Sequence, residues 1–123
     1  MRFVRFPGAA LIWVVAAAML APSASAVSHP FTDITAPWQV AAVDWLWTEG
    51  ITDGVSDTEF GPGRGVTRGE MAAFLHRAAG EPGGNPAHPF VDVTAPWQEE
   101  PVRWLSDAGI TDGVSADRYA PRR

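Results

Sequence analysis

The 123-residue chain has no cysteine and no lysine, and it has a single tyrosine. Without cysteine, the chain has no disulfide, no thiolate ligand for a metal and no thiol nucleophile. Its nine basic residues are all arginine and face 14 acidic residues, which gives a formal net charge of −5. An acidic chain without a basic stripe is a poor match for nucleic acid, whose binding depends on neutralising phosphates. An anionic membrane surface is disfavoured for the same reason.

Long apolar stretches are also scarce, and the single one lies near the N-terminus. The segment GAALIWVVAAAMLA follows Arg2 and Arg5 and precedes the small residues SASA. This pattern predicts a signal peptide over residues 1–26, with Val27 as the first mature residue. A retained membrane anchor is the alternative, but the run is shorter than the ~20 apolar residues of a spanning helix. We therefore expect a secreted protein with no membrane span after signal removal and a net charge of −7.

The rest of the chain contains a tandem duplication. Residues 29–62 align with residues 88–121 at an offset of 59, without a gap and with 20 of 34 positions identical. We call these segments the first copy and the second copy. Repeats of this length are typical of supersecondary units that share a core by stacking.

Each copy predicts one helix followed by a turn-rich loop. Pro101 replaces Ala42 and cannot lie inside a regular helix without losing a hydrogen bond, so we expect the helices to begin near Ala41 and Glu100. They end at glycines suited to the left-handed conformation, Gly50 and Gly109. Preceding turns would then hold Trp38 and Trp97 as apolar plugs, and Phe60 and Tyr119 would anchor the loops.

A second helix follows the first copy only. Thr67 as N-cap and Glu70 three residues later form a capping box, and Gly80 ends the run. Its expected apolar face consists of Met71, Phe74, Leu75 and Ala78. The predicted fold is mainly α, with tandem helix-loop-helix modules and long turn-rich connectors. The modules span residues 27–80 and 88–123, a linker spans 81–87, and the second module lacks its second helix.

The order of these elements resembles that of the S-layer homology (SLH) domain. The elements that carry the resemblance are F-x-D-[IV], W, WL, GITDG, F-x-P and VTRGEMAAFLHRA. The resemblance covers one complete module and the front two-thirds of another. It implies noncovalent attachment of an exported protein to the bacterial cell wall or cell surface through secondary wall polysaccharide. Members of this family typically use three modules, whose helices form a three-lobed bundle with binding grooves between the lobes.

The resemblance also implies a ligand-binding site. The family signature Thr-Arg-Ala-Glu reads Thr67-Arg68-Gly69-Glu70 here, which makes Arg68 a candidate contact for an acidic sugar, with Thr67 and Glu70 beside it. A guanidinium pairs well with a carboxylate. The alternative is a solvated Arg68 and a Glu70 that only caps the helix. Gly69 departs from the signature, and we expect glycine to loosen the start of this helix.

Other patterns favour structural roles. Tryptophans kept in both copies are expected in the core rather than in sugar stacking, whereas Trp47, replaced by Ser106 in the second copy, is a candidate ligand contact. The first copy's Asp57 and Glu59 are replaced by Ala116 and Arg118, which argues against a calcium loop. Three scattered histidines do not make a zinc site. We therefore expect no metal and no cofactor.

These observations predict a binding module rather than an enzyme. No pair of carboxylates and no serine–histidine pair has a spacing that indicates hydrolysis. The alternative is a structural or assembly subunit, or a truncated gene product, without a wall ligand of its own. In that case Trp104, Leu105 and Ile110 would lack a covering helix, and the chain would associate with itself or with further SLH modules.

Overall fold

The computed structural model describes residues 26–123, which hold three α-helices and no strand. They are α1 (Pro37–Thr48), α2 (Arg68–Ala78) and α3 (Pro96–Asp107). The mainly helical prediction is therefore confirmed. None of these helices has the length and apolarity needed to cross a membrane. The predicted signal peptide lies almost entirely in residues 1–25, outside the described part of the chain.

Helices α1 and α3 begin four residues earlier than predicted, because Pro37 and Pro96 occupy first-turn positions that suit proline. Pro101 lies inside α3 and does not end this helix. Because proline has no N–H, it removes the hydrogen bond that the carbonyl of Trp97 would otherwise accept. The prediction that Trp38 and Trp97 are buried plugs is wrong. They lie in the first helical turns and are 79% and 53% exposed.

Helix α2 confirms its predicted capping box but not its predicted buried face. The Thr67 hydroxyl accepts from the backbone N–H of Glu70 at 3.2 Å, and the Glu70 carboxylate accepts from the backbone N–H of Thr67 at 2.9 Å. The side of α2 that is buried consists of Gly69, Ala72, Ala73 and His76, whereas Met71 and Leu75 are exposed. Three of these four residues are glycine or alanine, which lets a neighbouring helix approach closely.

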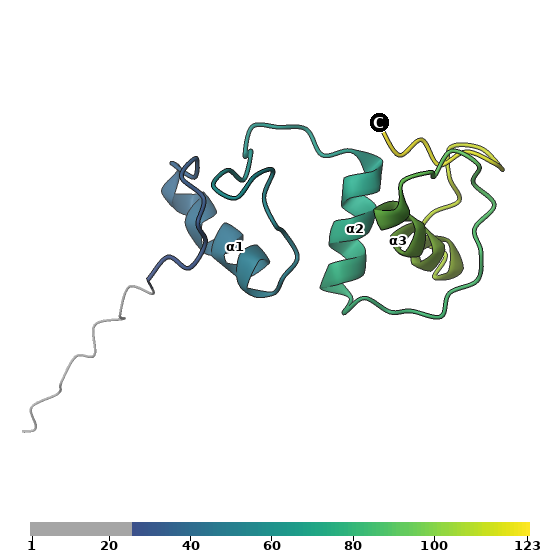
Figure 1. Ribbon diagram of the computed structural model, residues 1–123, viewed down its shortest axis with the longest axis horizontal. Coiled ribbons are helices and arrows are strands. Elements are labelled where there is room, and N and C mark those ends of the chain that lie inside the picture. The colour runs from purple at the N-terminus through teal and green to yellow at the C-terminus, as the bar shows by residue number, and fades with distance from the viewer. Residues whose placement is uncertain (1–25) are drawn as a thin grey trace, which may run out of the picture.

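That neighbour is α3 of the second copy, although α2 follows the first copy in sequence. Among the described helices, α2 and α3 are the only pair in contact, and α1 lies apart from both (Figure 1). The core of this part contains Ala72 of α2 together with second-copy side chains, namely Phe90, Val93, Val102, Leu105 and Tyr119, and Trp104 packs against it. The expectation that Trp104 and Leu105 lack a cover is therefore wrong, whereas Ile110 is exposed.

The loops of the two copies are held in the same way. The Asp33 carboxylate accepts from the backbone N–H groups of Phe60 and Gly61 at 2.9 and 2.7 Å. In the second copy, the Asp92 carboxylate accepts from those of Tyr119 and Ala120 at 2.8 and 2.9 Å. Each loop aromatic packs on the phenylalanine that opens its copy, Phe31 or Phe90, which confirms the predicted anchors.

Candidate ligand-binding grooves

The first turn of α2 is fastened to the end of the second copy. The backbone N–H groups of Arg68 and Gly69 donate to the main-chain oxygen atoms of Arg123 and Pro121 at 2.6 and 2.9 Å. These bonds satisfy amides that an isolated helix leaves without a partner. The Arg68 Nε donates to the carbonyl of Tyr119 at 2.8 Å, and the Tyr119 hydroxyl donates to the carbonyl of Arg68 at 2.9 Å. Arg68 therefore joins α2 to the second copy.

Gly69 is buried at this junction, directly against Gln98 of α3. A Cβ atom at Gly69 would overlap Nε2 of Gln98 and would lie 3.1 Å from the carbonyl oxygen of Pro121. We expected glycine to loosen the start of α2, but here the absence of a side chain allows the close packing that holds this helix in place.

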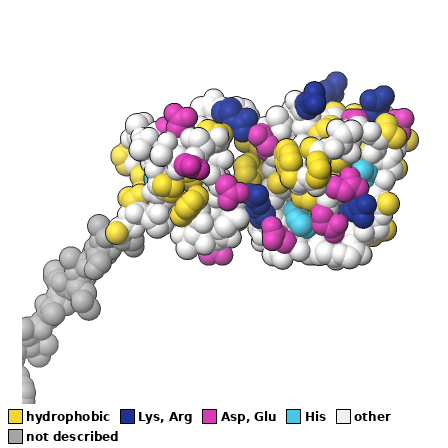
Figure 2. Space-filling model, viewed as in Figure 1, with side chains coloured by type: hydrophobic (Ala, Val, Ile, Leu, Met, Phe, Trp, Pro, Cys, Tyr) yellow, Lys and Arg dark blue, Asp and Glu magenta, His cyan; other side chains and the backbone are white. Residues whose placement is uncertain are grey.

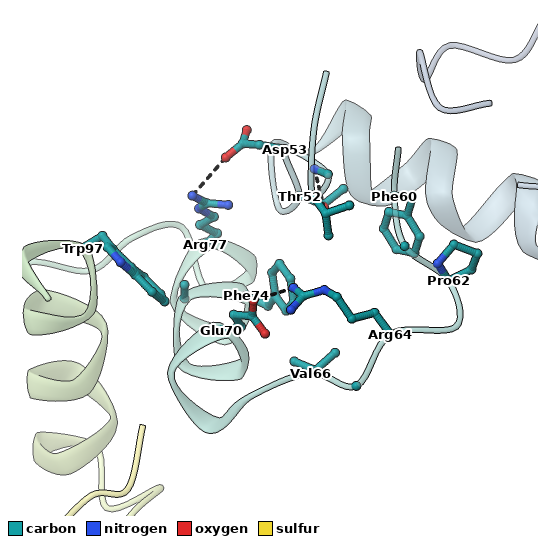
Figure 3. A pocket seen from close by; sticks show the side chains of 15 residues that line it. Thr52, Asp53, Phe60, Pro62, Arg64, Val66, Glu70, Phe74, Arg77 and Trp97 are labelled. Atoms are coloured by element: carbon teal, nitrogen blue, oxygen red, sulfur yellow. Dashed lines mark hydrogen bonds and ion pairs between the residues drawn. The ribbon is translucent and has the colours of Figure 1, made fainter. Parts of the chain in front are cut away.

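A groove of about 350 Å³ runs between the loop of the first copy and the opposite side of α2. We call it the central groove. Figure 2 shows a hollow at this boundary, with acidic and basic side chains along it. Its first-copy wall contains Thr52–Val55 and Phe60–Pro62, and the connector to α2 supplies Arg64 and Val66. Phe74 and Arg77 of α2 and Trp97 of α3 complete it (Figure 3).

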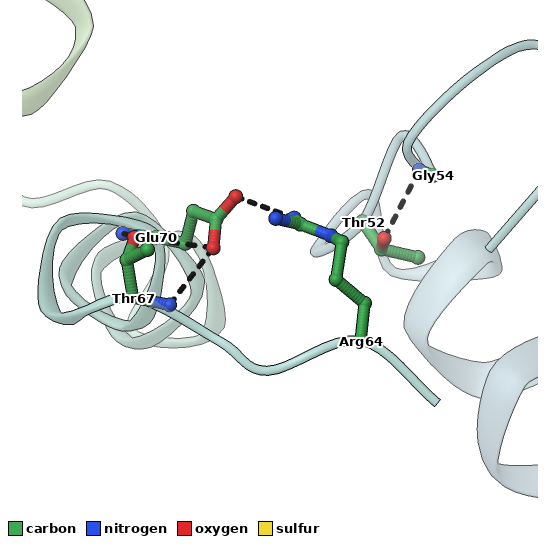
Figure 4. A network of polar contacts seen from close by, with 5 residues as sticks. All are labelled: Thr52, Gly54, Arg64, Thr67 and Glu70. Atoms are coloured by element: carbon green, nitrogen blue, oxygen red, sulfur yellow. Dashed lines mark hydrogen bonds and ion pairs between the residues drawn. The ribbon is translucent and has the colours of Figure 1, made fainter. Parts of the chain in front are cut away.

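Two arginines in the central groove are paired with carboxylates. Arg64 reaches across to Glu70, whose other oxygen accepts from Thr67 (Figure 4). The hydrogen bond from Arg64, followed by the one from the Thr67 N–H, lowers the pKa of Glu70. Arg77 forms an ion pair with Asp53 at 3.1 Å and donates to the carbonyl of Ile51 at 3.1 Å.

This arrangement can pair with a carboxylate beside aromatic rings. Guanidinium groups bind carboxylates in a fork geometry, and the groove also offers the rings of Phe60, Phe74 and Trp97. Asp53 is 77% exposed, and an exposed ion pair contributes ~0–1 kcal/mol. A ligand carboxylate can therefore replace Asp53 on Arg77 at little cost. The described residues contain no cluster of three or more potential metal-ligating side chains.

The predicted site residues do not all meet. Glu70 lines the central groove, and Thr67 caps α2 next to it. Arg68 lines a smaller groove of about 160 Å³, together with the exposed side chains of Met71, Leu75 and Ile110. Trp47 packs edge-on against Phe31, with ring centroids 5.3 Å apart, and lines neither groove.

Three residues of the central groove were missed from the sequence: Arg64, Arg77 and Trp97. Arg77 could have been found, because Glu70, Phe74 and Arg77 are spaced at i, i+4 and i+7 and so share one face of a helix. Arg64 lies in an irregular connector and Trp97 belongs to the other copy, so no local pattern links them to this face.

Comparisons with known proteins relate part of this chain to a described domain family. A family model of the S-layer homology domain matches residues 30–72. The chain is 33% identical over 123 residues to a cell surface protein of Thermoanaerobacter kivui, an alignment that covers 90% of this chain and 16% of that protein. It is 27% identical over 119 residues to an endoglucanase of Bacillus sp. strain KSM-635, covering 90% of this chain and 12% of the enzyme.

A third relative is endo-1,4-beta-xylanase A of Thermoanaerobacterium saccharolyticum, 30% identical over 84 residues that cover 68% of this chain and 7% of the enzyme. The chain thus spans a small part of each relative. No solved structure matches it. The match to the family model shows that residues 30–72 belong to an S-layer homology domain, and this segment contains the loop, the capping box and the first turn of α2 that form part of the central groove.

Proposed function

We propose that this chain attaches noncovalently to the bacterial cell wall by binding secondary wall polysaccharide in the central groove. One observation carries the proposal: Arg64, Arg77 and Trp97, which come from three separate segments, line one groove of sugar-binding size. Membership of the S-layer homology family supports association with the cell surface in general. The similarity to a protein named cell surface protein agrees with this.

The proposed ligand is an acidic sugar unit, one that carries a carboxylate or a carboxylate-bearing ketal. Arg77 would bind the carboxylate in place of Asp53, and the exposed ring of Trp97 would cover a sugar face. Glu70 would keep Arg64 oriented, and Thr67 would keep Glu70 in position. Arg68 would contribute to binding through the smaller groove and by holding α2 in place. Secretion and location at the wall are parts of this proposal.

The experiment is co-sedimentation of the protein with purified cell walls, before and after chemical removal of the secondary polymer. Wild-type protein should sediment only with walls that keep the polymer. Arg77→Gln should weaken binding at least tenfold, since loss of one charge-assisted contact is worth ~1.5–3 kcal/mol. The matched control is the variant Arg103→Gln. Arg103 lies on α3, is paired with Glu99 and is outside the central groove.

Arg68→Ala should run alongside, with thermal unfolding measured on the same sample. Because Arg68 joins α2 to the second copy, we expect lower stability together with weaker binding. If folded wild-type protein fails to sediment with intact walls, the wall-binding proposal is wrong. If Arg77→Gln binds as tightly as Arg103→Gln, the central groove is not the site.

A second candidate function is that of a structural or assembly subunit without a wall ligand. The observation that favours it is the apolar border of the smaller groove, where Met71, Leu75 and Ile110 are exposed. Sedimentation velocity over a hundredfold range of concentration tests it. Reversible self-association that Leu75→Glu abolishes would support this function, and a monomer at every concentration would exclude it.

A further inference from the structure

A second cavity adjoins the central groove where the first turns of α2 and α3 meet the end of the second copy. Its volume is about 290 Å³, and we call it the lateral groove. Glu70 and Trp97 line both grooves, so the two cavities lie next to each other. The lateral groove has further polar side chains that the central groove lacks, namely Thr67, Asp92, Thr94, Gln98 and Arg122.

Gln98 is the buried polar side chain of the lateral groove. Only 7% of this residue is exposed, and its side-chain amide lies in the space that Gly69 leaves by having no Cβ. Within residues 26–123, the amide makes no side-chain hydrogen bond. A buried amide without a partner is unfavourable for folding, so its presence calls for an explanation.

The Gln98 amide is buried but not sealed. In the described part of the chain, the fully enclosed side-chain atoms that lack a partner are the Nε2 atoms of His29 and His88. The Gln98 amide is not among them, and the cavity that Gln98 lines is the lateral groove. A molecule in this groove can therefore supply the hydrogen bonds that the protein does not.

The charges around the lateral groove favour a neutral ligand. The carboxylates of Glu70 and Asp92 line it against one guanidinium, that of Arg122. Both carboxylates already accept N–H groups, Glu70 from Thr67 and Asp92 from two loop amides. They would repel an anion, and Arg122 would repel a cation. A neutral polar ligand avoids both costs.

The free polar groups match two adjacent hydroxyls of a sugar ring. The Gln98 side chain offers one acceptor oxygen and one NH₂ donor in a common plane, and each sugar hydroxyl can donate and accept. One hydroxyl can thus donate to Oε1 of Gln98 while its neighbour accepts from Nε2. The exposed hydroxyl of Thr94 and the half-exposed indole of Trp97 line the same cavity, and an indole can cover the apolar face of a ring.

We propose that the lateral groove is a second sugar subsite, which binds a neutral pyranose through two adjacent hydroxyls on the Gln98 amide. Because Trp97 and Glu70 line both grooves, this pyranose would be the neighbour of the acidic unit along one polymer chain. Its assignment to the wall polymer rests on the proposed function. The binding of a free neutral sugar at Gln98 does not.

The probes are the methyl glycosides of glucose, mannose and galactose, which differ in the arrangement of adjacent hydroxyls. Each is titrated into the ¹⁵N-labelled full chain, and NMR follows the side-chain NH₂ of Gln98 and the indole N–H of Trp97. We expect at least one glycoside to shift both signals saturably, with a Kd of about 1 mM, as suits a ligand of this size. The side-chain NH₂ of Gln39, the counterpart on α1, should not move.

Gln98→Met keeps the length of the side chain and removes the amide. Since no side-chain hydrogen bond within the described residues is lost, the unfolding temperature should stay the same or rise, whereas glycoside binding should fall at least tenfold. Gln39→Met is the matched control and should bind within twofold of the wild type. Thr94→Val, at an exposed position, tests the groove without changing the core and should weaken binding about threefold, with Thr35→Val as its control.

The proposal is wrong if none of the three glycosides shifts the Gln98 signal of the folded chain. Equal affinities for Gln98→Met and Gln39→Met would also overturn it. Arg77→Gln separates this proposal from the previous one, because Arg77 lines the central groove and not the lateral groove. It should weaken wall binding and leave the affinity for the free glycoside unchanged. If the glycoside binds at Gln98 but intact walls do not bind, the subsite stands and its assignment to the wall polymer fails.

Discussion

Gly69 shows how one residue can be unfavourable for a helix and still be required by the fold. By helix propensity alone, alanine at this position would stabilise α2 by ~1 kcal/mol relative to glycine. Its Cβ, however, would overlap the buried amide of Gln98 and press on the carbonyl of Pro121. Overpacking of this kind typically costs ~1–3 kcal/mol. Because Gln98 is buried, we expect the packing cost to exceed the gain in helix propensity.

We predict that Gly69→Ala lowers the free energy of unfolding by about 1 kcal/mol in urea denaturation. The same substitution in a Gln98→Ala background should instead be neutral or stabilising by up to ~1 kcal/mol, since the obstructing amide is gone. Additive effects in this double-mutant cycle would show that the close approach of Gln98 does not determine the choice of glycine.

Asp33 and Asp92 make the stability depend on pH. The N–H of Phe60 is the main cause that lowers the pKa of Asp33 below its ordinary 3.8. Burial raises the pKa of Asp92, but the N–H groups of Tyr119 and Ala120 together outweigh it. Both native pKa values are lower than in the unfolded chain, so the unfolded chain takes up protons first as the pH falls.

The stability from these two carboxylates should be fully present above about pH 5 and decline below pH 4. Asp33→Asn and Asp92→Asn should each unfold at lower temperature at pH 7 and show a shallower loss of stability between about pH 5 and pH 2. Asp57→Asn, at an exposed loop position, serves as control and should keep the wild-type profile. An unchanged acid slope in both variants would contradict this assignment.

At the scale of elements, the existence of the helices was predicted from the sequence more accurately than the contacts that they make. Capping residues and glycine stops act locally, so the capping box and the glycines after each helix were predicted correctly. The buried face of α2 was not, because it is chosen by a helix of the other copy. For the same reason, the position of Trp97 in the central groove was not predicted, because Trp97 belongs to the other copy. The helix starts were placed too late because Pro101 was weighted above Pro37 and Pro96.

Amide hydrogen exchange tests the difference between the two helices. The amides of Val102–Leu105 lie under α2, whereas the equivalent segment of α1 has no covering helix. After correction for intrinsic rates, we expect exchange at least tenfold slower in α3 than in α1. Tyr119→Phe should lower the free energy of the opening that permits exchange by ~1 kcal/mol in α2 and α3. It should leave exchange in α1 unchanged. Equal protection of α1 and α3 would contradict the packing described here.

For the whole molecule, net charge opposes the proposed anionic ligand. The chain carries a formal charge of −5, while binding is assigned to two arginines in one groove. The long-range repulsion extends over a Debye length of about 30 Å at 0.01 M salt and about 10 Å at 0.1 M. Short contacts inside a groove are screened less.

We therefore predict that wall binding strengthens as salt is raised from about 0.01 to 0.1 M, measured by co-sedimentation with polymer-bearing walls. The control is the same titration with walls stripped of the polymer, which should show no salt-dependent retention. A steady fall in affinity over this range would mean that the arginine contacts outweigh the net charge.

The assignment of α2 to the second copy has a consequence for how such genes can be cut and joined. A crossover within residues 81–87 would respect the repeat in the sequence but separate α2 from the loop carbonyls that hold its first turn. A crossover near residues 62–66 would keep α2, α3 and their shared core on one piece. The unit that can be transferred intact between proteins is thus offset from the unit that was duplicated.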